Sequence, residues 1–537
     1  MSTHVIHLQK VLSESEYQTI DNFCSAHQGL KNLPEIAVFL KDKFSLALIL
    51  DPDIISGFAS DSSNLPAQAE ALCRPENERQ AAAVLRAARA AGIPLTLSGG
   101  RSNLTGSATA EGGIVLSTAK LNSPAVAIDS EKMVVTTPIN IILEDLRNEI
   151  LDATNRNLYY PVDPTSRGDA WVGGTIACNA SGFTPGEIGA TRDWVTGLDI
   201  IFPNGLKISA VRGQYISENG KFILETKTGE NSIEWPVPTY PRPAIKNASG
   251  PFSSPDGRID LIDMFIGSEG LFGLVSGCTL KLAPHPETYI DLFFSLPDES
   301  RALAFYQFLD QELEGNFGNL SAFEYFGVNA LKYMDHKEKL FYGDNQVAIY
   351  LQIPAQEKTL TEQIEIWFER LINSACEIDP QAVLLLDNEP KRRIFMESRH
   401  SMPANALEVI QQHGTYTIMT DAVVPPRHFA EFLDYCHNLL KNEAIEYLAF
   451  GHFGDCHLHF TLLPEQKKLQ RAAEIYDLFI AKAIALGGVY SGEHGTGKRK
   501  RKDFTKLYDP TAITQLKNCK AALDPDFLIN RGNVFVP

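Results

Sequence analysis

SGGRSNLTGSA, residues 98–108, is a loop rich in glycine, serine and asparagine. The run before it, IPLTL at 93–97, reads as a strand, and the alanine-rich segment before that reads as a helix from Pro75 and Glu76 to Gly92. Glycine at the end of a strand lets backbone N–H groups approach an anion closely, as a pyrophosphate requires. The stretch therefore predicts a mixed α and β domain with an anion-binding turn.

Three further glycine-rich segments lie in the same half of the chain. They are YYPVDPTSRGDAWVGGTIACNASG (159–182), GATRDWVTGLDIIFPNG (189–205) and IGSEGLFGLV (266–275). Neither GxGxxG nor GxxxxGK[ST] occurs, so a Rossmann or P-loop nucleotide site is not supported. A turn would explain each glycine alone, but four such segments together favour a cofactor cradle. Ser102, Asn103 and Asn179 could complete its polar contacts.

A histidine-rich region begins with GHFGDCHLHF, residues 451–460. His452 and His459 flank FGDC, which favours a strand–turn–strand over a helix, so the two imidazoles can converge on one ion. Glu493 in SGEHGTG (491–497) would complete a set of two histidines and one glutamate, a common pattern for Zn²⁺ or another divalent metal with an open position. A structural or merely exposed histidine cluster is the alternative.

Two more histidines belong to these segments. His457 alternates with His459 in one strand register, so both could point to one face and His457 could compete as a ligand. His494 lies directly beside Glu493 in a glycine-rich loop. A metal ligand beside a proton acceptor suits chemistry in which the metal holds and acidifies a hydroxyl group while the imidazole takes its proton.

Length, charge and cysteine usage limit the classes of protein. A chain of 537 residues predicts two or more domains, and a formal net charge of −18 argues against a nucleic-acid partner. We find no signal peptide and no apolar run of about 18 residues, so we expect a cytoplasmic protein, with a peripheral contact with the inner membrane left open. The eight cysteines form no CxxC pair, which favours reduced thiols over a cysteine-bound metal.

Two segments stand apart in composition. The basic run KRKRK (498–502) is expected to be a solvated surface turn, with a contact for an anionic substrate, cofactor or lipid headgroup as the alternative. Residues 231–258 are rich in Pro, Gly and Ser and predict a long loop, a kind of segment that often carries function.

The chain divides into four predicted regions. They are a helical extension at 1–66, a cofactor domain at 67–283, a second domain at 284–510 and a closing segment at 511–537. In the second domain we expect helices at 299–313, 358–375 and 425–443 and strands at 345–354, 415–425 and 445–453. Helices packed on one face of an antiparallel sheet would make this domain, and the whole chain, α+β.

The glycine-rich segments resemble the flavin-binding domain of the vanillyl-alcohol-oxidase/PCMH type, through SGGRSNLTGS, PVDP, GGTIACNASG and IGSEGLFGLV. The resemblance implies FAD between two α+β subdomains, with its pyrophosphate on the first loop and its ring facing a substrate-covering cap domain. Some relatives attach FAD through a histidine of that loop. No histidine occurs between residues 28 and 284, so noncovalent FAD is expected. Arg101 stands where relatives usually carry glycine.

The expected FAD contacts come from these segments and from the chain end, LDPDFLINRGNVF. They are Ser98, Gly99, Gly100, Arg101, Ser102, Asn103, Leu104, Pro161, Asp163, Gly173, Gly174, Asn179, Gly182, Gly189, Thr191, Gly267, Glu269, Gly270, Gly273, Val275 and Asn530.

The histidine-rich half resembles the substrate domain of the FAD-linked D-2-hydroxy-acid dehydrogenases, the group that contains D-lactate dehydrogenase and the flavin-binding chain of glycolate oxidase. GHFGDCHLHF is similar to their GHxGDGNxH segment and SGEHGTGKRK to their GEHGxG segment; DAVVPPR and ESRHSMP extend the resemblance, which covers about 70–537. It implies Zn²⁺ or Mn²⁺ on His452, His459 and Glu493, with His494 as the base and Arg399 on the substrate carboxylate. Cys456 and His457 stand where the family shows Gly and Asn.

The resemblance implies oxidation of a D-2-hydroxy acid to the 2-oxo acid, with the hydride passing to flavin N5. No cation lies just before Asp421, which favours D-lactate over D-2-hydroxyglutarate; glycolate also stays open. An enzyme similar to alkylglycerone-phosphate synthase is a rival, although Glu493 replaces the histidine expected there. A catalytically silent flavin-binding or metal-binding module is another. A quinone, a cytochrome or a flavoprotein is expected as electron acceptor, and a homodimer is compatible with the sequence.

Overall fold

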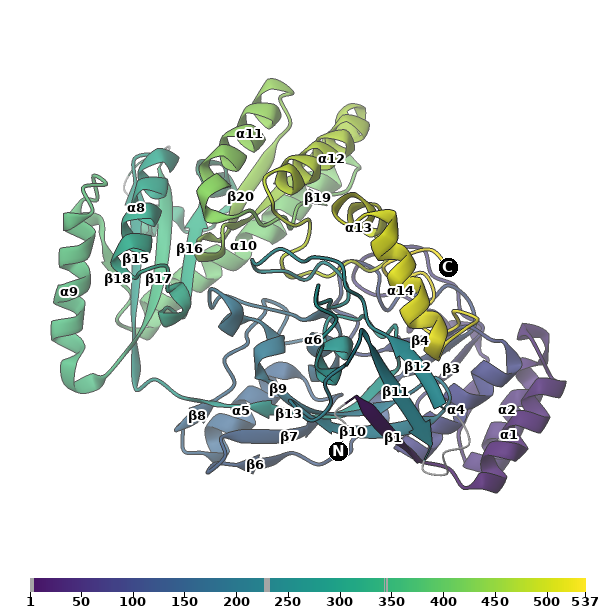
Figure 1. Ribbon diagram of the computed structural model, residues 1–537. Coiled ribbons are helices and arrows are strands. Elements are labelled where there is room, and N and C mark those ends of the chain that lie inside the picture. The colour runs from purple at the N-terminus through teal and green to yellow at the C-terminus, as the bar shows by residue number, and fades with distance from the viewer. Residues whose placement is uncertain (1–3, 227–231, 342, 344–345) are drawn as a thin grey trace.

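The computed structural model describes residues 4–226, 232–341, 343 and 346–537. Two bodies built on separate sheets lie against each other, with the cap domain above the cofactor domain in Figure 1. None of the helices in these residues combines the length and the apolar character needed to cross a bilayer.

A four-stranded sheet carries the first glycine-rich loop. Its strands are, in spatial order, β2 (Leu48–Ile49), β3 (Ala71–Cys73), β5 (Ile114–Ser117) and β4 (Leu95–Ser98). The helix α4 (Glu78–Ala91) connects β3 to β4, and most of its alanines are buried, which lets the helix approach the sheet closely. The Asn77 side chain caps α4, so the helix begins slightly later than expected, and Gly92 ends it at φ 65°, as expected. β4 then delivers the chain into the loop at 98–108.

A larger sheet forms the rest of the cofactor domain. Its strands are, in spatial order, β12 (Ser232–Pro236), β11 (Lys221–Thr226), β1 (Val5–Lys10), β10 (Leu206–Val211), β9 (Val195–Ile201), β13 (Leu274–Lys281), β7 (Val134–Pro138) and β6 (Ala127–Asp129). The domain also contains α5 (Leu143–Ala153), α6 (Val172–Cys178), α7 (Leu261–Phe265) and the short pair β8 (Leu158–Tyr159) and β14 (Ala283–Pro284).

The N-terminal extension is helical only in part. It contains α1 (Glu14–Ala26), α2 (Leu33–Phe44) and α3 (Pro52–Ser56), as the sequence led us to expect. Its first strand, β1, however, is inserted in the larger sheet, parallel to β11 and antiparallel to β10. The extension is therefore built into the cofactor domain.

The cap domain is built on an antiparallel sheet of seven strands. They are, in spatial order, β18 (Leu384–Leu385), β15 (Thr288–Leu296), β17 (Val347–Ala355), β16 (Ala322–Phe326), β20 (Tyr447–His452), β21 (His457–Leu462) and β19 (Ile418–Met419). Four helices contribute to the core on one side: α8 (Glu299–Glu312), α9 (Leu360–Asn373), α11 (Phe429–Asn442) and α12 (Leu469–Ala485).

The opposite face of this sheet is covered by a helix that the sequence did not lead us to expect, α10 (Glu389–His413). Alternate residues of β15 reach the two sides: the ring of Phe294 lies 5.2 Å from Phe305 of α8, and the ring of Phe293 lies 5.7 Å from Phe395 of α10. Pro403 lies inside α10, and such a proline is a usual reason to end a predicted helix. The cap therefore has helices on both faces, not on one.

The chain end returns to the cofactor domain, beside the cap (Figure 1). The helices α13 (Arg501–Leu507) and α14 (Pro510–Leu523) lead there, and Trp235 of β12 donates to the Cys519 carbonyl at 3.1 Å. Leu95 of β4 then exchanges hydrogen bonds with Leu528 and Asn530, at 2.9 and 2.8 Å. The last residues thus lie beside the strand that ends in the first loop.

Candidate functional site

A cavity of about 600 Å³ lies where the glycine-rich loops meet the cap. The cap contributes the predicted metal, base and arginine residues: Arg399, His452, His459, Glu493 and His494. The cofactor domain contributes two-thirds of the predicted FAD contacts: Ser98, Gly99, Gly100, Arg101, Ser102, Asn103, Leu104, Gly173, Gly174, Glu269, Gly270, Gly273, Val275 and Asn530. The fold thus places both halves of the predicted site around the same cavity.

Seven predicted FAD contacts lie outside the cavity lining. They are Pro161, Asp163, Asn179, Gly182, Gly189, Thr191 and Gly267. Several support the loops from behind: Asp163 accepts a hydrogen bond from the Phe183 N–H at 3.1 Å, and Thr191 donates to the Ala180 carbonyl at 2.7 Å. Their positions favour support of the cradle over direct contact.

The cradle has the features that a bound cofactor needs. A side chain at Gly174 would point into open space, whereas one at Gly100 would come within 2.6 Å of the Asp169 carbonyl, so the backbone there is tightly enclosed. The hydroxyl oxygens of Ser98 and Ser181 are buried in the lining and have no hydrogen-bond partner among the described residues. Buried polar groups are normally satisfied, so these two suit polar groups of a ligand such as FAD.

Arg101 adopts a left-handed backbone conformation, with φ 61°. Glycine is the residue that reaches this region without strain, which gives a physical reason for glycine in relatives. The guanidinium donates to the Gly57 carbonyl and lies 4.9 Å from the ring of Phe58. Arg101 therefore ties the loop to the N-terminal extension.

The polar groups of Glu269 and Asn530 form hydrogen bonds within the protein. The buried carboxylate of Glu269 accepts from the Thr496 and Gly497 N–H groups, both at 2.7 Å. Asn530 accepts from the Leu97 N–H and donates to the Glu269 carbonyl, both at 2.7 Å. The two residues join the cradle to the chain that follows the predicted base.

The predicted metal ligands face one another across a short gap. The strand–turn–strand is confirmed: β20 ends at His452, a turn follows, and β21 begins at His457. The Nε2 atoms of His452 and His459 lie 3.3 and 3.2 Å from the two carboxylate oxygens of Glu493. Imidazole nitrogens and a carboxylate are donors that Zn²⁺ and similar ions accept, and the buried Oε2 atom of Glu493 has no hydrogen-bond partner within the described part of the chain. The residues fit a divalent metal.

Glu324 of β16 fixes one of these ligands from behind. Its carboxylate lies 2.6 Å from Nδ1 of His452 and accepts from Nη2 of Arg399 at 2.8 Å. Burial would raise the pKa of Glu324, but His452 and Arg399 lower it to about 2. Burial would likewise lower the pKa of His452, but Glu324 and Glu493 raise it to about 9. A carboxylate that orients a ligating histidine is a common support in metal sites.

Arg399 lies on α10 and reaches the cavity beside Phe183. Its guanidinium carbon is 4.2 Å from that ring, and the pair with Glu324 is almost fully buried. The Nε atom of Arg399 is buried and has no hydrogen-bond partner among the described residues. The residue is therefore a rigid cation with a donor left over.

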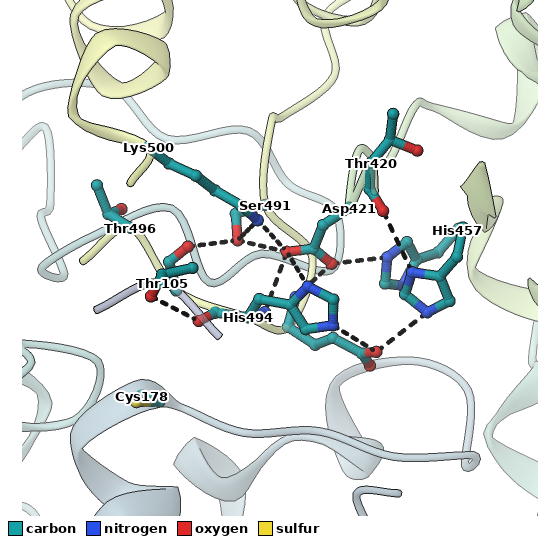
Figure 2. A network of polar contacts seen from close by, with 12 residues as sticks. Thr105, Cys178, Thr420, Asp421, His457, Ser491, His494, Thr496 and Lys500 are labelled. Atoms are coloured by element: carbon teal, nitrogen blue, oxygen red, sulfur yellow. Dashed lines mark hydrogen bonds and ion pairs between the residues drawn. The ribbon is translucent and has the colours of Figure 1, made fainter. Parts of the chain in front are cut away.

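Asp421 is the centre of the polar network in Figure 2. It is fully buried and accepts from Ser491 Oγ at 2.6 Å, Lys500 Nζ at 2.7 Å and the His494 N–H at 3.0 Å. Its other oxygen lies 2.9 Å from Nε2 of His457. Burial would raise the pKa of Asp421, but His494, Lys500 and His457 hold it well below its usual range. The carboxylate fixes the segment that carries the predicted base.

His494, the predicted base, is held by contacts with two residues. Its ring is stacked on His459 at 5.4 Å, its Nδ1 lies 3.6 Å from Asp421, and its side chain keeps 17% exposure toward the cavity. Burial lowers the pKa of His494 to about 4, despite the attraction of Asp421. The imidazole is therefore neutral near pH 7 and able to accept a proton.

The segment predicted as a long loop at 231–258 is a loop only in part, because its first described residues form β12 (Ser232–Pro236). Residue 231 lies outside the described part of the chain, and the rest of the segment reaches the predicted metal ligands. Lys246 of this loop is buried, with Nζ 3.0 Å from Asp455 and 3.5 Å from Glu493. Burial alone would lower the pKa of Lys246, but these two carboxylates raise it. The loop thus brings a fixed positive charge to the edge of the cluster.

Most of the basic run at 498–502 is bound by the protein. Lys500 is buried against Asp421, Lys498 donates to Asn533 at 2.7 Å, and Arg501 pairs with Glu111 at 2.8 Å. Arg499 donates to the Ser63 carbonyl, so its guanidinium too is bound by the protein. The expected solvated turn is therefore wrong for Lys498, Lys500 and Arg501, whose side chains bind acceptors from distant segments, whereas Lys502 is exposed.

Replacing Lys500 with methionine should destabilise the protein by about 3–5 kcal/mol, since Asp421 would stay buried without its cation. Lys502 is exposed on the same run, so its replacement by methionine is the control and should change the stability by about 0.5 kcal/mol or less. Urea denaturation of both variants measures the shift. Equal shifts would contradict the role given to the buried pair.

Several residues of the site are absent from the sequence prediction. They are Lys246, Glu324, Asp421, Asp455, Ser491 and Lys500. Glu324 and Asp421 did carry a signal: each is a single acid within an apolar strand-like run, SAFEYFGV and TIMTDAVVP. A charge in such a run is either at a sheet edge or buried with a partner. Lys246 carries no comparable signal in its loop.

Two family models match the chain. Residues 69–209 match the one described as FAD binding domain, and residues 315–534 match FAD linked oxidases, C-terminal domain. A D-lactate dehydrogenase of Anaerostipes hadrus is 27% identical over 95% of this chain and 99% of its own length. The glycolate oxidase subunit GlcD of Bacillus subtilis (strain 168) is 26% identical over 87% of this chain and 89% of its own.

Solved structures share the arrangement of the two domains. p-Cresol methylhydroxylase with substrate bound has a TM-score of 0.65 at 12% identity, covering 98% of this chain and 99% of that one. An alkyldihydroxyacetonephosphate synthase has a TM-score of 0.62 at 14% identity, covering 99% and 87%. At such identities the likeness concerns the fold alone, and it confirms the expected α+β class.

Proposed function

Because this chain belongs to the FAD-linked oxidases and has the PCMH-type FAD-binding fold, we propose that it oxidises a D-2-hydroxy acid, with D-lactate as the first candidate. One observation carries the proposal. Arg399, the His452–His459–Glu493 cluster and His494 line the same cavity as the glycine-rich cradle. A carboxylate binder, a metal site and a base beside a flavin site are the groups that this oxidation needs.

The residues of the chain have separate tasks in this reaction. Arg399 binds the substrate carboxylate and fixes its orientation, since a planar guanidinium matches a carboxylate. His494, neutral and stacked on His459, takes the proton of the 2-hydroxyl group. Asp421, 3.6 Å from Nδ1 of His494, keeps the ring in place and stabilises the imidazolium that forms.

Two groups that these residues would hold supply the remaining chemistry. The cradle would hold FAD, which would serve as the hydride acceptor, and His452, His459 and Glu493 would hold Zn²⁺ or Mn²⁺, which would polarise the hydroxyl group as a Lewis acid. Ser98 and Ser181, whose hydroxyl oxygens are buried in the lining, would hydrogen-bond to the cofactor.

The cap side of the cavity favours a small monocarboxylate. Met419 and Phe450 line it together with Arg399, and Met419 lies just before Thr420 and Asp421 in the chain. Among the described residues of the lining, the arginine and lysine side chains are Arg399 and Arg101, and Arg101 belongs to the first loop. A second carboxylate, as in D-2-hydroxyglutarate, would find no such cation on the cap side, whereas the methyl group of D-lactate suits an apolar wall.

Anaerobic mixing of the FAD-loaded enzyme with D-lactate should bleach the flavin absorption, whereas L-lactate should leave it unchanged. Glycolate and D-2-hydroxyglutarate, which occur in the names of relatives of the chain, should bleach the flavin more slowly than D-lactate. Treatment with a chelator should abolish the bleaching, and added Zn²⁺ or Mn²⁺ should restore it. Fastest bleaching by D-2-hydroxyglutarate would contradict the substrate choice, and bleaching by none of the four would contradict the reaction.

The electron acceptor is a separate proposal. Reduced flavin must pass its electrons on, and we propose a quinone, a cytochrome or another flavoprotein as the partner. Reoxidation of the bleached enzyme by each of these, compared with reoxidation by dioxygen, separates the candidates.

A further inference from the structure

His457 is a buried histidine with one nitrogen unaccounted for. Its side chain has no exposed surface. Nε2 lies 2.9 Å from Asp421, while Nδ1 is buried and has no hydrogen-bond partner among the described residues. A histidine that served only to bind Asp421 would normally have its second nitrogen solvated or bonded. The unsatisfied Nδ1 therefore points to a ligand.

The position of His457 indicates that the missing partner of Nδ1 is the metal ion predicted on His452, His459 and Glu493. His457 is paired with His452 across the two strands and lies two residues before His459, on the same face of β21. The rings of His452 and His459 lie 5.5 and 4.6 Å from the ring of His457. Each of these three histidines and Glu493 offers one ligand atom, and the four atoms lie within 4.8 Å of one another.

This spacing suits four bonds to one ion. With metal–ligand bonds of about 2.1 Å, two donors on opposite sides of an ion are about 4.2 Å apart, and adjacent donors are closer. A small movement of the side chains would bring four donors of the observed cluster to these distances. The gap is thus compatible with four ligands as well as with three.

The hydrogen bond with Asp421 prepares the ring for this task. The carboxylate accepts the Nε2–H, which fixes the tautomer and leaves the lone pair on Nδ1. Carboxylate, histidine and metal in series are a frequent arrangement in metal sites.

We propose that His457 is a fourth protein ligand of the metal, bound through Nδ1. The inference rests on the proposed function, because it concerns the same divalent metal. It makes the site one of three imidazoles and one carboxylate, where the family pattern has an asparagine at this position. Such a nitrogen-rich set favours Zn²⁺ over Mn²⁺, since imidazole suits zinc and oxygen donors suit manganese.

X-ray absorption spectroscopy on the Zn²⁺-loaded holoenzyme counts the imidazoles around the metal without any turnover. We expect three imidazoles in the natural enzyme and two in His457→Asn, which places the family residue there and can still donate to Asp421. The control, His428→Asn, changes a histidine outside the cavity lining and should keep three. Two imidazoles in the natural enzyme would overturn the inference.

Competition with a chelator gives a second readout. The Zn²⁺ affinity of His457→Asn should fall at least about 10-fold below that of the natural enzyme and of His428→Asn. Equal affinities of all three proteins would overturn the fourth ligand, while leaving the proposed function intact. Absence of any Zn²⁺ or Mn²⁺ binding by the natural enzyme would overturn the metal of the proposed function, and the inference with it.

Discussion

Replacing His494 with alanine is expected to lower kcat by about 10²- to 10⁴-fold while FAD stays bound. The ring is stacked on His459, neutral near pH 7, and placed by Asp421 beside the cavity, so its loss removes the proton acceptor. Its backbone N–H, which binds Asp421 at 3.0 Å, would be kept. Turnover with D-lactate and the visible flavin spectrum measure the two parts of this prediction.

The control for this variant is His428→Ala, a histidine of the cap that pairs with Glu431 outside the cavity lining. It should keep both turnover and flavin. Metal content should be unchanged in His494→Ala, because the predicted ligands remain. Full turnover by His494→Ala would show that another group takes the proton, and loss of the flavin would show that the residue supports the cradle instead.

The sequence predicts the fold of this chain where local patterns carry the information. The alanine-rich α4 with its glycine end, β4 and the loop at 98–108 appear as expected because capping, burial period and glycine content act within a short stretch. Helix α10 was not expected because Pro403 interrupts a 25-residue helix. β1 was not expected because a strand at the N-terminus finds its partners some 200 residues later in the chain.

The same division holds for the site. Histidines and glycines mark their places by composition, so the cluster on β20 and β21 and the cradle could be proposed from the sequence. The supporting charges could not, because their partners are far apart in the chain. Arg399 and Glu324 are separated by 75 residues, and Lys500 and Asp421 by 79. These two ion pairs can be recognised only in the three-dimensional structure, where the oppositely charged side chains lie in contact.

Arg399→Lys is expected to lower kcat/KM for D-lactate by about 10- to 150-fold, the loss of one charged hydrogen bond worth about 1.5–3 kcal/mol. Lysine keeps the positive charge but not the planar fork. In the enzyme one branch of this fork, Nη2, already binds Glu324 at 2.8 Å, and the Nε atom is left for a ligand. A single ammonium group cannot serve Glu324 and the substrate carboxylate with the same geometry.

The ion pair with Glu324 also determines whether Arg399→Lys affects the fold or the binding of the substrate. Because Glu324 would still be neutralised by the lysine and by His452, the fold and the metal cluster should persist, and the change should fall on the substrate. Arg393→Lys, an exposed arginine on the same helix, is the matched control and should keep kcat/KM. Steady-state kinetics with D-lactate measure both variants. Equal kcat/KM for the two variants would mean that the substrate carboxylate binds elsewhere. A carboxylate that is bound by Arg399 must lose affinity when the planar guanidinium is replaced by an ammonium group.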